Sequence, residues 1–168
     1  KIIDNPVEIV DESLPFMGVK QISIQTVICN IARISFSGEL SYEIYIPSDY
    51  AQSIMELIWS RAQEFESCLY GLEALGTMRI EKGHVTSAEI DGRVTIEDIG
   101  LGGMASKKKD FVGGILKNRK ALNHSDRPQL VGIFPKNKNK SFKVGALLNE
   151  ARLSKGHPIG WVTSVTFS

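Results

Sequence analysis

The spacing of apolar residues changes between Pro47 and Ser48, and this change constrains the fold more than any other feature of the chain. Before it, apolar and polar residues alternate in residues 39–47, as they do on a strand with one buried face. The apolar set is Tyr42, Ile44 and Ile46. After it, apolar residues recur every three to four positions, which is typical of the buried stripe of a helix. The pattern predicts an α+β fold with an antiparallel sheet and flanking helices.

The same periodicities predict the remaining elements of the first part of the chain. Two strands are expected within residues 21–36, followed by a turn at Ser37 and Gly38 and a return strand at 39–47. Helices are expected over residues 48–64, 71–82 and 110–122. The first should bury a stripe of Ile54, Leu57, Ile58 and Ala62, and Gly83 should end the second. In the second of these helices, Leu72, Leu75 and Arg79 are expected to share the inward face.

A polar stretch at residues 123–128 separates these elements from a tail with β character only. Its β-like segments are expected at 129–135, 142–149 and 159–167. We therefore expect an α+β domain over residues 1–122 and a small all-β part over residues 123–168. Three strands are too few for a sheet with a closed core, so both parts are expected to belong to a longer protein.

Composition narrows the class of function. The 168 residues carry a formal net charge of +1, which argues against a general nucleic-acid or membrane-surface binder. No apolar run approaches the roughly 20 residues of a membrane span. The two cysteines are too few for a disulfide framework, and neither has the spacing of a metal ligand. We expect a cytoplasmic protein without a metal site.

Two charged residues stand where a ligand could use them. Glu43, in the predicted return strand, could accept two donors from a heterocycle, or could simply face solvent. Arg79 continues the apolar face of a predicted helix near its end. It could hold an anionic group, or could be a cation favoured by the helix dipole. The residues alone leave these alternatives open.

Four stretches resemble signatures of the glycine-cleavage aminomethyltransferase family, and they occur in the order of that family. The first is Pro15-Phe16-Met17 followed by ISFSGELSYEI at residues 34–44, and the second is MRIEKG at 78–83. The third is KKDFVG at residues 108–113, and the fourth is GWVTS at 160–164. Within the family, the resemblance is strongest to the alpha subunits of heterotetrameric sarcosine oxidases.

The resemblance implies a part in the oxidative demethylation of sarcosine to glycine and hydrogen peroxide, with the one-carbon unit passed to tetrahydrofolate. It implies that Glu43 accepts hydrogen bonds from the pterin ring and that Tyr42 flanks this ring. It also implies that Arg79 lies near the folate site, paired with Glu43 or a neighbouring acid. The essential aspartate of the family is expected upstream of Lys1, so no catalytic residue is assigned.

The resemblance also implies cofactors and partners outside this chain. The resemblance implies FAD or FMN and NAD in the complete enzyme. We expect them to bind outside this chain, because the chain has no dinucleotide-binding fingerprint. Other subunits of a hetero-oligomeric oxidase are expected as partners, and the chain alone is expected to be inactive and to dimerise.

Two alternatives remain open. The first is another enzyme of the family, either the aminomethyltransferase of glycine cleavage or a dimethylglycine oxidase or dehydrogenase. The second, from a different class, is a non-catalytic folate-binding scaffold protein. One such group carries a cysteine directly after a Lys-Gly pair, where this chain has His84.

Overall fold

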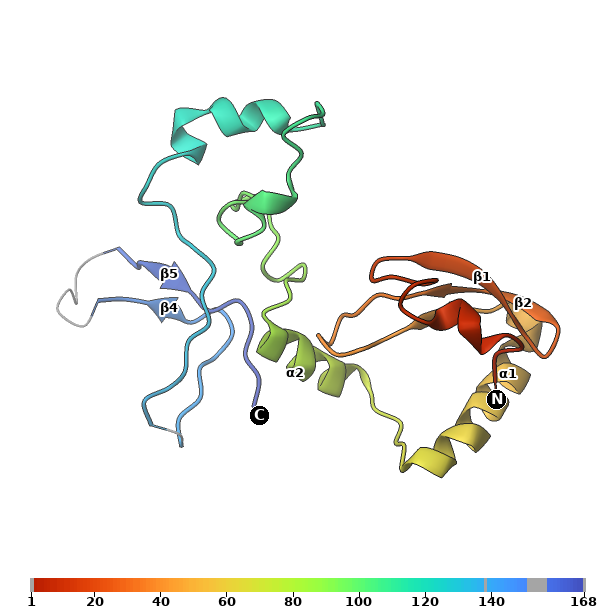
Figure 1. Ribbon diagram of the computed structural model, residues 1–168. Coiled ribbons are helices and arrows are strands. Elements are labelled where there is room, and N and C mark those ends of the chain that lie inside the picture. The colour runs from red at the N-terminus through yellow and green to blue at the C-terminus, as the bar shows by residue number, and fades with distance from the viewer. Residues whose placement is uncertain (1, 138, 151–156, 168) are drawn as a thin grey trace. The chain divides into compact units, whose positions relative to one another are not determined.

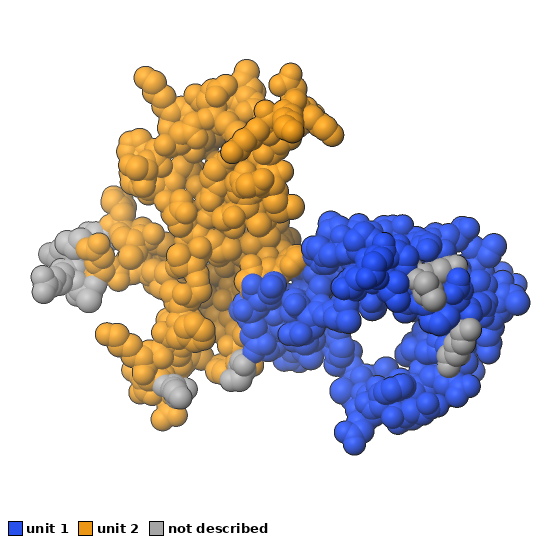
Figure 2. Space-filling model, in the orientation of Figure 1, with its two compact units in different colours: residues 1–82 blue, residues 83–168 orange. Residues whose placement is uncertain are grey.

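The computed structural model describes residues 2–137, 139–150 and 157–167 (Figure 1). The chain forms two compact units, residues 1–82 (unit 1) and 83–168 (unit 2) (Figure 2). An antiparallel sheet, two α-helices and a small second sheet confirm the predicted α+β class. In this part of the chain, no helix has the length and apolar character needed to cross a membrane. The domain boundary expected between residues 122 and 123 lies inside unit 2 and stays a prediction.

Unit 1 is built on a three-stranded antiparallel sheet in the order β1-β2-β3. The strands are β1 (Val19–Ile24), β2 (Val27–Ala32) and β3 (Glu43–Tyr45). A two-residue turn, Gln25 and Thr26, joins β1 to β2, and both residues have positive φ. Turns of this handedness match the twist of the strands that they connect.

The core of unit 1 lies between one face of this sheet and the helix α1 (Ala51–Ala62). Its buried residues are Leu14, Ile22, Ile24, Cys29, Ile31 and Ile54. Leu57 and Ile58 of α1 pack against this cluster, as the helical spacing predicted. A short 3₁₀ turn (Ser48–Tyr50) precedes α1, so the α-helix begins three residues later than expected.

The second helix, α2 (Leu72–Lys82), ends before Gly83, which has a φ of 77° and stops the helix as predicted. The predicted inward face is wrong at Leu72, which is 85% exposed, whereas Leu75 and Arg79 are half-buried. Helical spacing defines which residues share a face, but another element must cover that face before it is buried.

Unit 2 contains little regular structure. Strands β4 (Leu147–Leu148) and β5 (Gly160–Trp161) pair antiparallel within the segments predicted at 142–149 and 159–167. The third predicted strand, at residues 129–135, is wrong, because the structure has no strand there.

The predicted helix at residues 110–122 is also wrong. The structure has two 3₁₀ segments instead, Gly114–Asn118 and Lys120–Leu122. Gly113 precedes the first with a φ of 85°, a left-handed conformation that a regular helix cannot contain. Arg119, between the two segments, is extended. The apolar spacing at 110–122 therefore forms two short turns rather than a continuous helix.

Candidate functional site

The connection from β2 to β3 contains most of the signature at residues 34–44, and local hydrogen bonds fix its shape. The backbone N–H of Gly38 donates to the Ser35 Oγ atom over 2.9 Å, and that of Glu39 donates to Ser37 Oγ over 3.4 Å. Gly38 has a φ of 92°. The serines and the glycine of this signature therefore define the turn itself.

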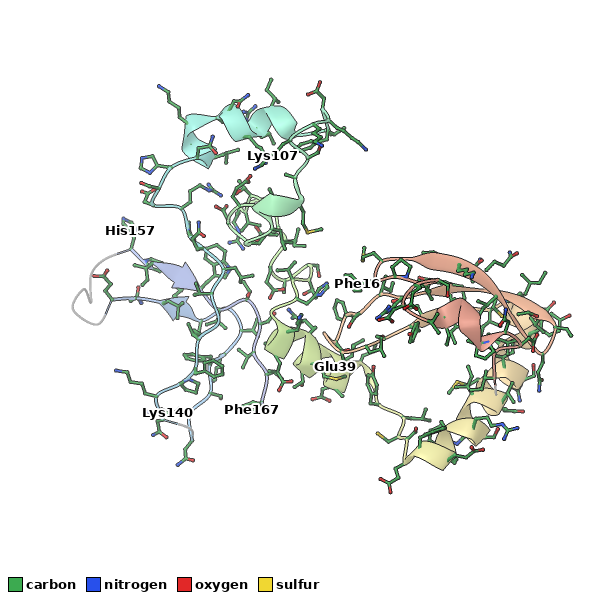
Figure 3. All side chains as sticks on the ribbon, viewed as in Figure 1. Phe16, Glu39, Lys107, Lys140, His157 and Phe167 are labelled. Atoms are coloured by element: carbon green, nitrogen blue, oxygen red, sulfur yellow. The ribbon has the colours of Figure 1, made fainter. Side chains whose placement is uncertain are left out.

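This turn lies against the last turn of α2. A Cβ atom added to Gly38 would be 2.7 Å from Lys82 Cδ, closer than non-bonded carbon atoms approach. Figure 3 labels Glu39 in the same loop, beside α2. The contact brings the first signature together with the second, because Lys82 belongs to the RIEKG sequence at residues 79–83.

Glu43 is the first residue of β3, and Tyr42 directly precedes this strand; the two side chains lie on opposite sides, as the period-two pattern predicted. Glu43 is exposed, and its Oε2 atom accepts a hydrogen bond from the Tyr45 hydroxyl over 2.5 Å. This hydrogen bond raises the pKa of Tyr45, because the carboxylate favours the neutral phenol. Tyr42 is partly buried and packs against the core cluster. Arg79 is half-buried in α2, and its proximity to Glu43 stays a prediction.

Arg33, directly before the first signature, was not singled out by the sequence, and the structure gives it an anchoring role. Its guanidinium forms an ion pair with Asp11 over 2.6 Å and donates to the Leu14 carbonyl oxygen over 3.2 Å. Its backbone carbonyl accepts from Met17 N–H over 2.9 Å, and its N–H donates to the Gly18 carbonyl over 3.0 Å. Arg33 thus holds the lead-in segment against the sheet. Its place next to the signature was the only signal in the sequence.

In unit 2, the buried carboxylate of Glu89 joins the fourth signature to the segment that follows α2. Glu89 accepts from the backbone N–H of Thr86 over 2.8 Å, from its hydroxyl over 3.1 Å, and from the hydroxyl of Ser164. Burial opposes ionisation, but hydrogen bonds from Ser164, Thr86 and Thr163 hold the pKa of Glu89 below its usual range. Sequence reasoning missed this residue, since nothing local distinguishes it from an exposed glutamate.

A buried ion pair between Asp98 and Arg127 lies in the same unit. Arg127 Nε donates to both carboxylate oxygens of Asp98, over 3.0 and 3.1 Å, and its Nη2 donates to Asp98 and to the Arg93 carbonyl. Asp98 is 4% exposed and also accepts from Thr95 N–H over 2.7 Å. The hydrogen bond from Arg127 is the main cause that lowers the pKa of Asp98. The guanidinium of Arg93 lies 4.6 Å from the ring centre of Trp161. This network stabilises unit 2 and leaves no free acid or base for catalysis among its members.

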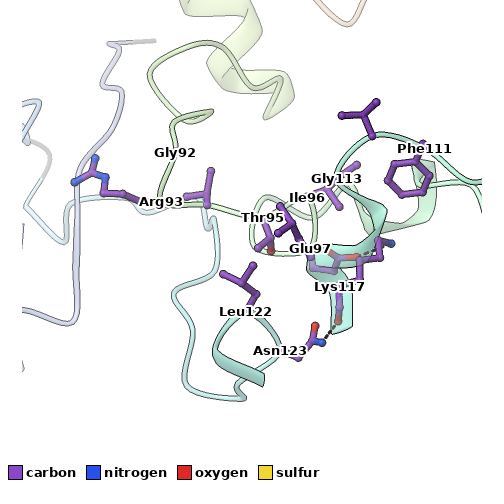
Figure 4. A pocket seen from close by; sticks show the side chains of 13 residues that line it. Gly92, Arg93, Thr95, Ile96, Glu97, Phe111, Gly113, Lys117, Leu122 and Asn123 are labelled. Atoms are coloured by element: carbon purple, nitrogen blue, oxygen red, sulfur yellow. Dashed lines mark hydrogen bonds and ion pairs between the residues drawn. The ribbon is translucent and has the colours of Figure 1, made fainter. Parts of the chain in front are cut away.

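Unit 2 also has a hollow of about 240 Å³, lined by residues of the segments 92–97, 111–117 and 122–123 (Figure 4). Phe111 of the third signature and Ile96 contribute apolar surface. At its edge Lys117 Nζ pairs with Glu97 Oε1 over 2.9 Å and lies 6.0 Å from the Phe111 ring centre. The hollow can hold a small apolar group, but its charges are already paired. Among the described residues, no group of His, Cys, Asp or Glu has the arrangement of a metal site.

Comparison with known proteins identifies the class to which these signatures belong. Residues 2–109 match the family described as "GCVT N-terminal domain", and the chain belongs to this family. "Sarcosine oxidase subunit alpha" of Rhizobium meliloti (strain 1021) is 39% identical over the whole chain, and that of Corynebacterium sp. (strain P-1) is 36% identical over 94% of it. The "Aminomethyltransferase" of Desulforamulus reducens is 27% identical over 87% of the chain.

The chain is much shorter than these relatives. It spans 17% of the length of both sarcosine oxidase subunits and 39% of the aminomethyltransferase. What each complete relative does therefore bears on this chain only as a proposal.

Proposed function

We propose that this chain contributes part of a tetrahydrofolate-binding region of a sarcosine-oxidising enzyme. In that enzyme, tetrahydrofolate takes up the one-carbon unit released when sarcosine is demethylated to glycine. The observation that carries the proposal is the contact of the loop at Gly38 with Lys82 in the last turn of α2. This contact unites two signature stretches that resemble the folate-binding part of the family. The names of the relatives at 35–39% identity support the same assignment.

The residues at this place suit a pterin ring. Glu43 offers a solvent-facing carboxylate, and the 2-amino group and adjacent N–H of a pterin form a parallel pair of donors. The hydroxyl of Tyr45, two residues along the same face of β3, donates to one carboxylate oxygen and helps to orient the group. In the proposal Arg79 orients a nearby acid, and Tyr42, which directly precedes Glu43, flanks the pterin ring.

Oxidation of the N-methyl group needs a flavin, because amino-acid side chains do not carry out hydride transfer. The chain has no dinucleotide-binding fingerprint. We therefore assign FAD or FMN, NAD and the oxidative half of the reaction to other parts of a hetero-oligomeric enzyme. The chain alone is proposed to be inactive with sarcosine.

The test is a calorimetric titration of the complete enzyme with tetrahydrofolate. Glu43→Gln should weaken binding by about 1.5–3 kcal/mol, the scale of hydrogen bonds to a charged group. The matched control is Glu56→Gln, which changes another exposed glutamate of unit 1, on α1. An affinity for tetrahydrofolate that is the same in Glu43→Gln and in the unaltered enzyme would refute the role of Glu43.

A second candidate is an aminomethyltransferase, and the observation that favours it is the match to relatives of that name over 82–87% of the chain. The two candidates differ in the release of hydrogen peroxide from sarcosine, which only an oxidase produces. A peroxide assay on the complete enzyme separates them. The scaffold alternative lacks support at residue 84, where a histidine stands in place of the cysteine.

A further inference from the structure

Tyr45 and Glu43 form a pair on the face of β3 that points away from the core. Side chains two residues apart on a strand share a face, and both of these are exposed. β3 ends the strand order β1-β2-β3, and its register places Tyr45 opposite Asn30 and Glu43 opposite Ala32. Tyr45 is 53% exposed, so part of its side chain is covered by the protein. The sheet thus supports the pair from one side and leaves its polar atoms outside the core.

A charge-assisted hydrogen bond joins the two side chains. The Tyr45 hydroxyl donates to Glu43 Oε2 over 2.5 Å, at the short end of the range for hydroxyl groups that donate to carboxylates. This hydrogen bond raises the pKa of Tyr45, so the phenol stays protonated and remains a donor at neutral pH. Among the described residues, the Glu43 carboxylate accepts no second hydrogen bond. One contact therefore orients this carboxylate and leaves most of its acceptor capacity unused.

The acceptor positions that remain match a pair of donors. An ionised carboxylate has two oxygens with about four lone-pair positions, and Tyr45 occupies one position on Oε2. Oε1 and the second position on Oε2 can still accept two parallel hydrogen bonds. A ligand with donors on adjacent atoms satisfies both oxygens, whereas a ligand acceptor placed against either oxygen leaves it unsatisfied. The pair therefore suits a ligand edge that carries two donors.

The hydrogen bond also limits the freedom of Glu43 before any ligand arrives. A glutamate side chain is long and flexible, and fixing it when a ligand binds costs conformational entropy. Tyrosine has fewer rotatable bonds, and the Tyr45 side chain is partly covered, so it is the stiffer partner. Because Tyr45 already holds Oε2, part of this entropy is lost on folding rather than on binding. Such preorganisation increases affinity without a new contact to the ligand.

We propose that Tyr45 is a positioning residue of the folate site, and that it holds Glu43 as a two-oxygen acceptor that selects a 4-oxo pteridine over a 4-amino pteridine. The N3 atom of the 4-oxo ring carries a hydrogen and donates beside the 2-amino group. In the neutral 4-amino ring, N3 is an acceptor, and its lone pair would face a carboxylate oxygen. This selection rests on the proposed function, because Glu43 must contact this edge of the pterin ring.

Calorimetric titration of the complete enzyme with tetrahydrofolate and with its 4-amino-4-deoxy analogue tests the selection. The unaltered enzyme should bind the analogue more weakly by about tenfold or more, because one carboxylate oxygen then faces an acceptor. Glu43→Gln replaces one oxygen by an NH₂ group, which can donate to the N3 acceptor of the analogue. The preference of this variant should therefore shift toward the analogue by about tenfold or more, relative to the unaltered enzyme.

Tyr45→Phe tests the positioning role. The variant removes the hydroxyl and keeps the ring, so tetrahydrofolate should bind about three- to tenfold more weakly. Tyr50→Phe removes the hydroxyl of another exposed tyrosine of unit 1 and is the matched control, which should keep the affinity within about twofold. In a Glu43→Ala background, Tyr45→Phe should have no further effect, because no carboxylate remains to be held. A merely structural role of Tyr45 would weaken binding equally in both backgrounds.

Each failure has its own signature. If Glu43→Gln leaves the affinity for tetrahydrofolate unchanged, the proposed function itself fails. If Glu43→Gln weakens tetrahydrofolate without a shift toward the analogue, the selection is wrong while the contact of Glu43 with folate stands. If Tyr45→Phe binds tetrahydrofolate as tightly as the unaltered enzyme, or more tightly, the positioning role is overturned, because the hydroxyl then is idle or competes with the ligand.

Discussion

The buried pair of Asp98 and Arg127 allows a quantitative prediction for the stability of unit 2. Asp98→Asn removes the negative charge but keeps the shape of the side chain and an oxygen that can accept from Thr95. It leaves the guanidinium of Arg127 without its counter-charge. Removing one partner of a buried pair costs about 3–5 kcal/mol. The Arg127 side chain is 17% exposed, so water relieves part of this cost, and we expect a loss of about 2–3 kcal/mol at pH 7.

The pH dependence supplies a second, independent outcome. Arg127 lowers the pKa of Asp98 in the folded state relative to the unfolded chain. The pair therefore stabilises the fold above the unfolded pKa of about 4, and this stabilisation is lost as the pH falls through the folded pKa. The difference between the unaltered chain and Asp98→Asn should thus be largest near pH 7 and shrink toward pH 3 and below.

Urea unfolding measures both outcomes. The chain has two tryptophans, so a Trp59→Phe background leaves Trp161 of unit 2 as the only tryptophan reporter. Trp161 stacks with Arg93, whose carbonyl accepts from Arg127, so its fluorescence reports on this network. Asp110→Asn, at an exposed acid of the same unit, is the control and should change the stability little. A loss below about 0.5 kcal/mol for Asp98→Asn, or a loss that does not vary with pH, would refute the reasoning.

Two further predictions follow from the loop of unit 1 and from the Glu89 cluster. Gly38→Ala should lower the free energy of unfolding by about 1–3 kcal/mol, because the added Cβ meets Lys82 and the φ of 92° disfavours alanine. Gly71→Ala is the control, because a Cβ there would meet nothing within 4 Å. It should lower the thermal midpoint of unfolding less than Gly38→Ala does. Ser164→Ala should raise the pKa of Glu89, seen by NMR titration of its carboxyl carbon, because a hydrogen bond to the carboxylate is lost. Asn149→Ala, which leaves this cluster intact, should not shift that titration.

The sequence by itself determined the local elements and the class of protein. Alternation in residues 39–47 correctly placed Ile44 and Glu43 on opposite faces, since successive side chains of a strand must point to opposite faces. Helical spacing correctly placed Ile54 in the core, and Gly83 correctly marked the end of α2. The order of the signature stretches was sufficient to indicate the family that the comparison then showed.

Only the tertiary structure decided which of these residues are covered by other parts of the chain, and which charged residues are paired. Leu72 has the spacing of a core residue but is exposed, and residues 129–135, which were expected to form a strand, form none. The partners of Asp98 and Glu89 lie 29 and 75 residues further along the chain. The spacing of apolar residues predicts which side chains share a face within one helix or strand. A buried ion pair depends instead on which distant segments the fold brings together. The sequence therefore singled out Glu43 as a candidate, but not the two buried carboxylates of Glu89 and Asp98 in unit 2.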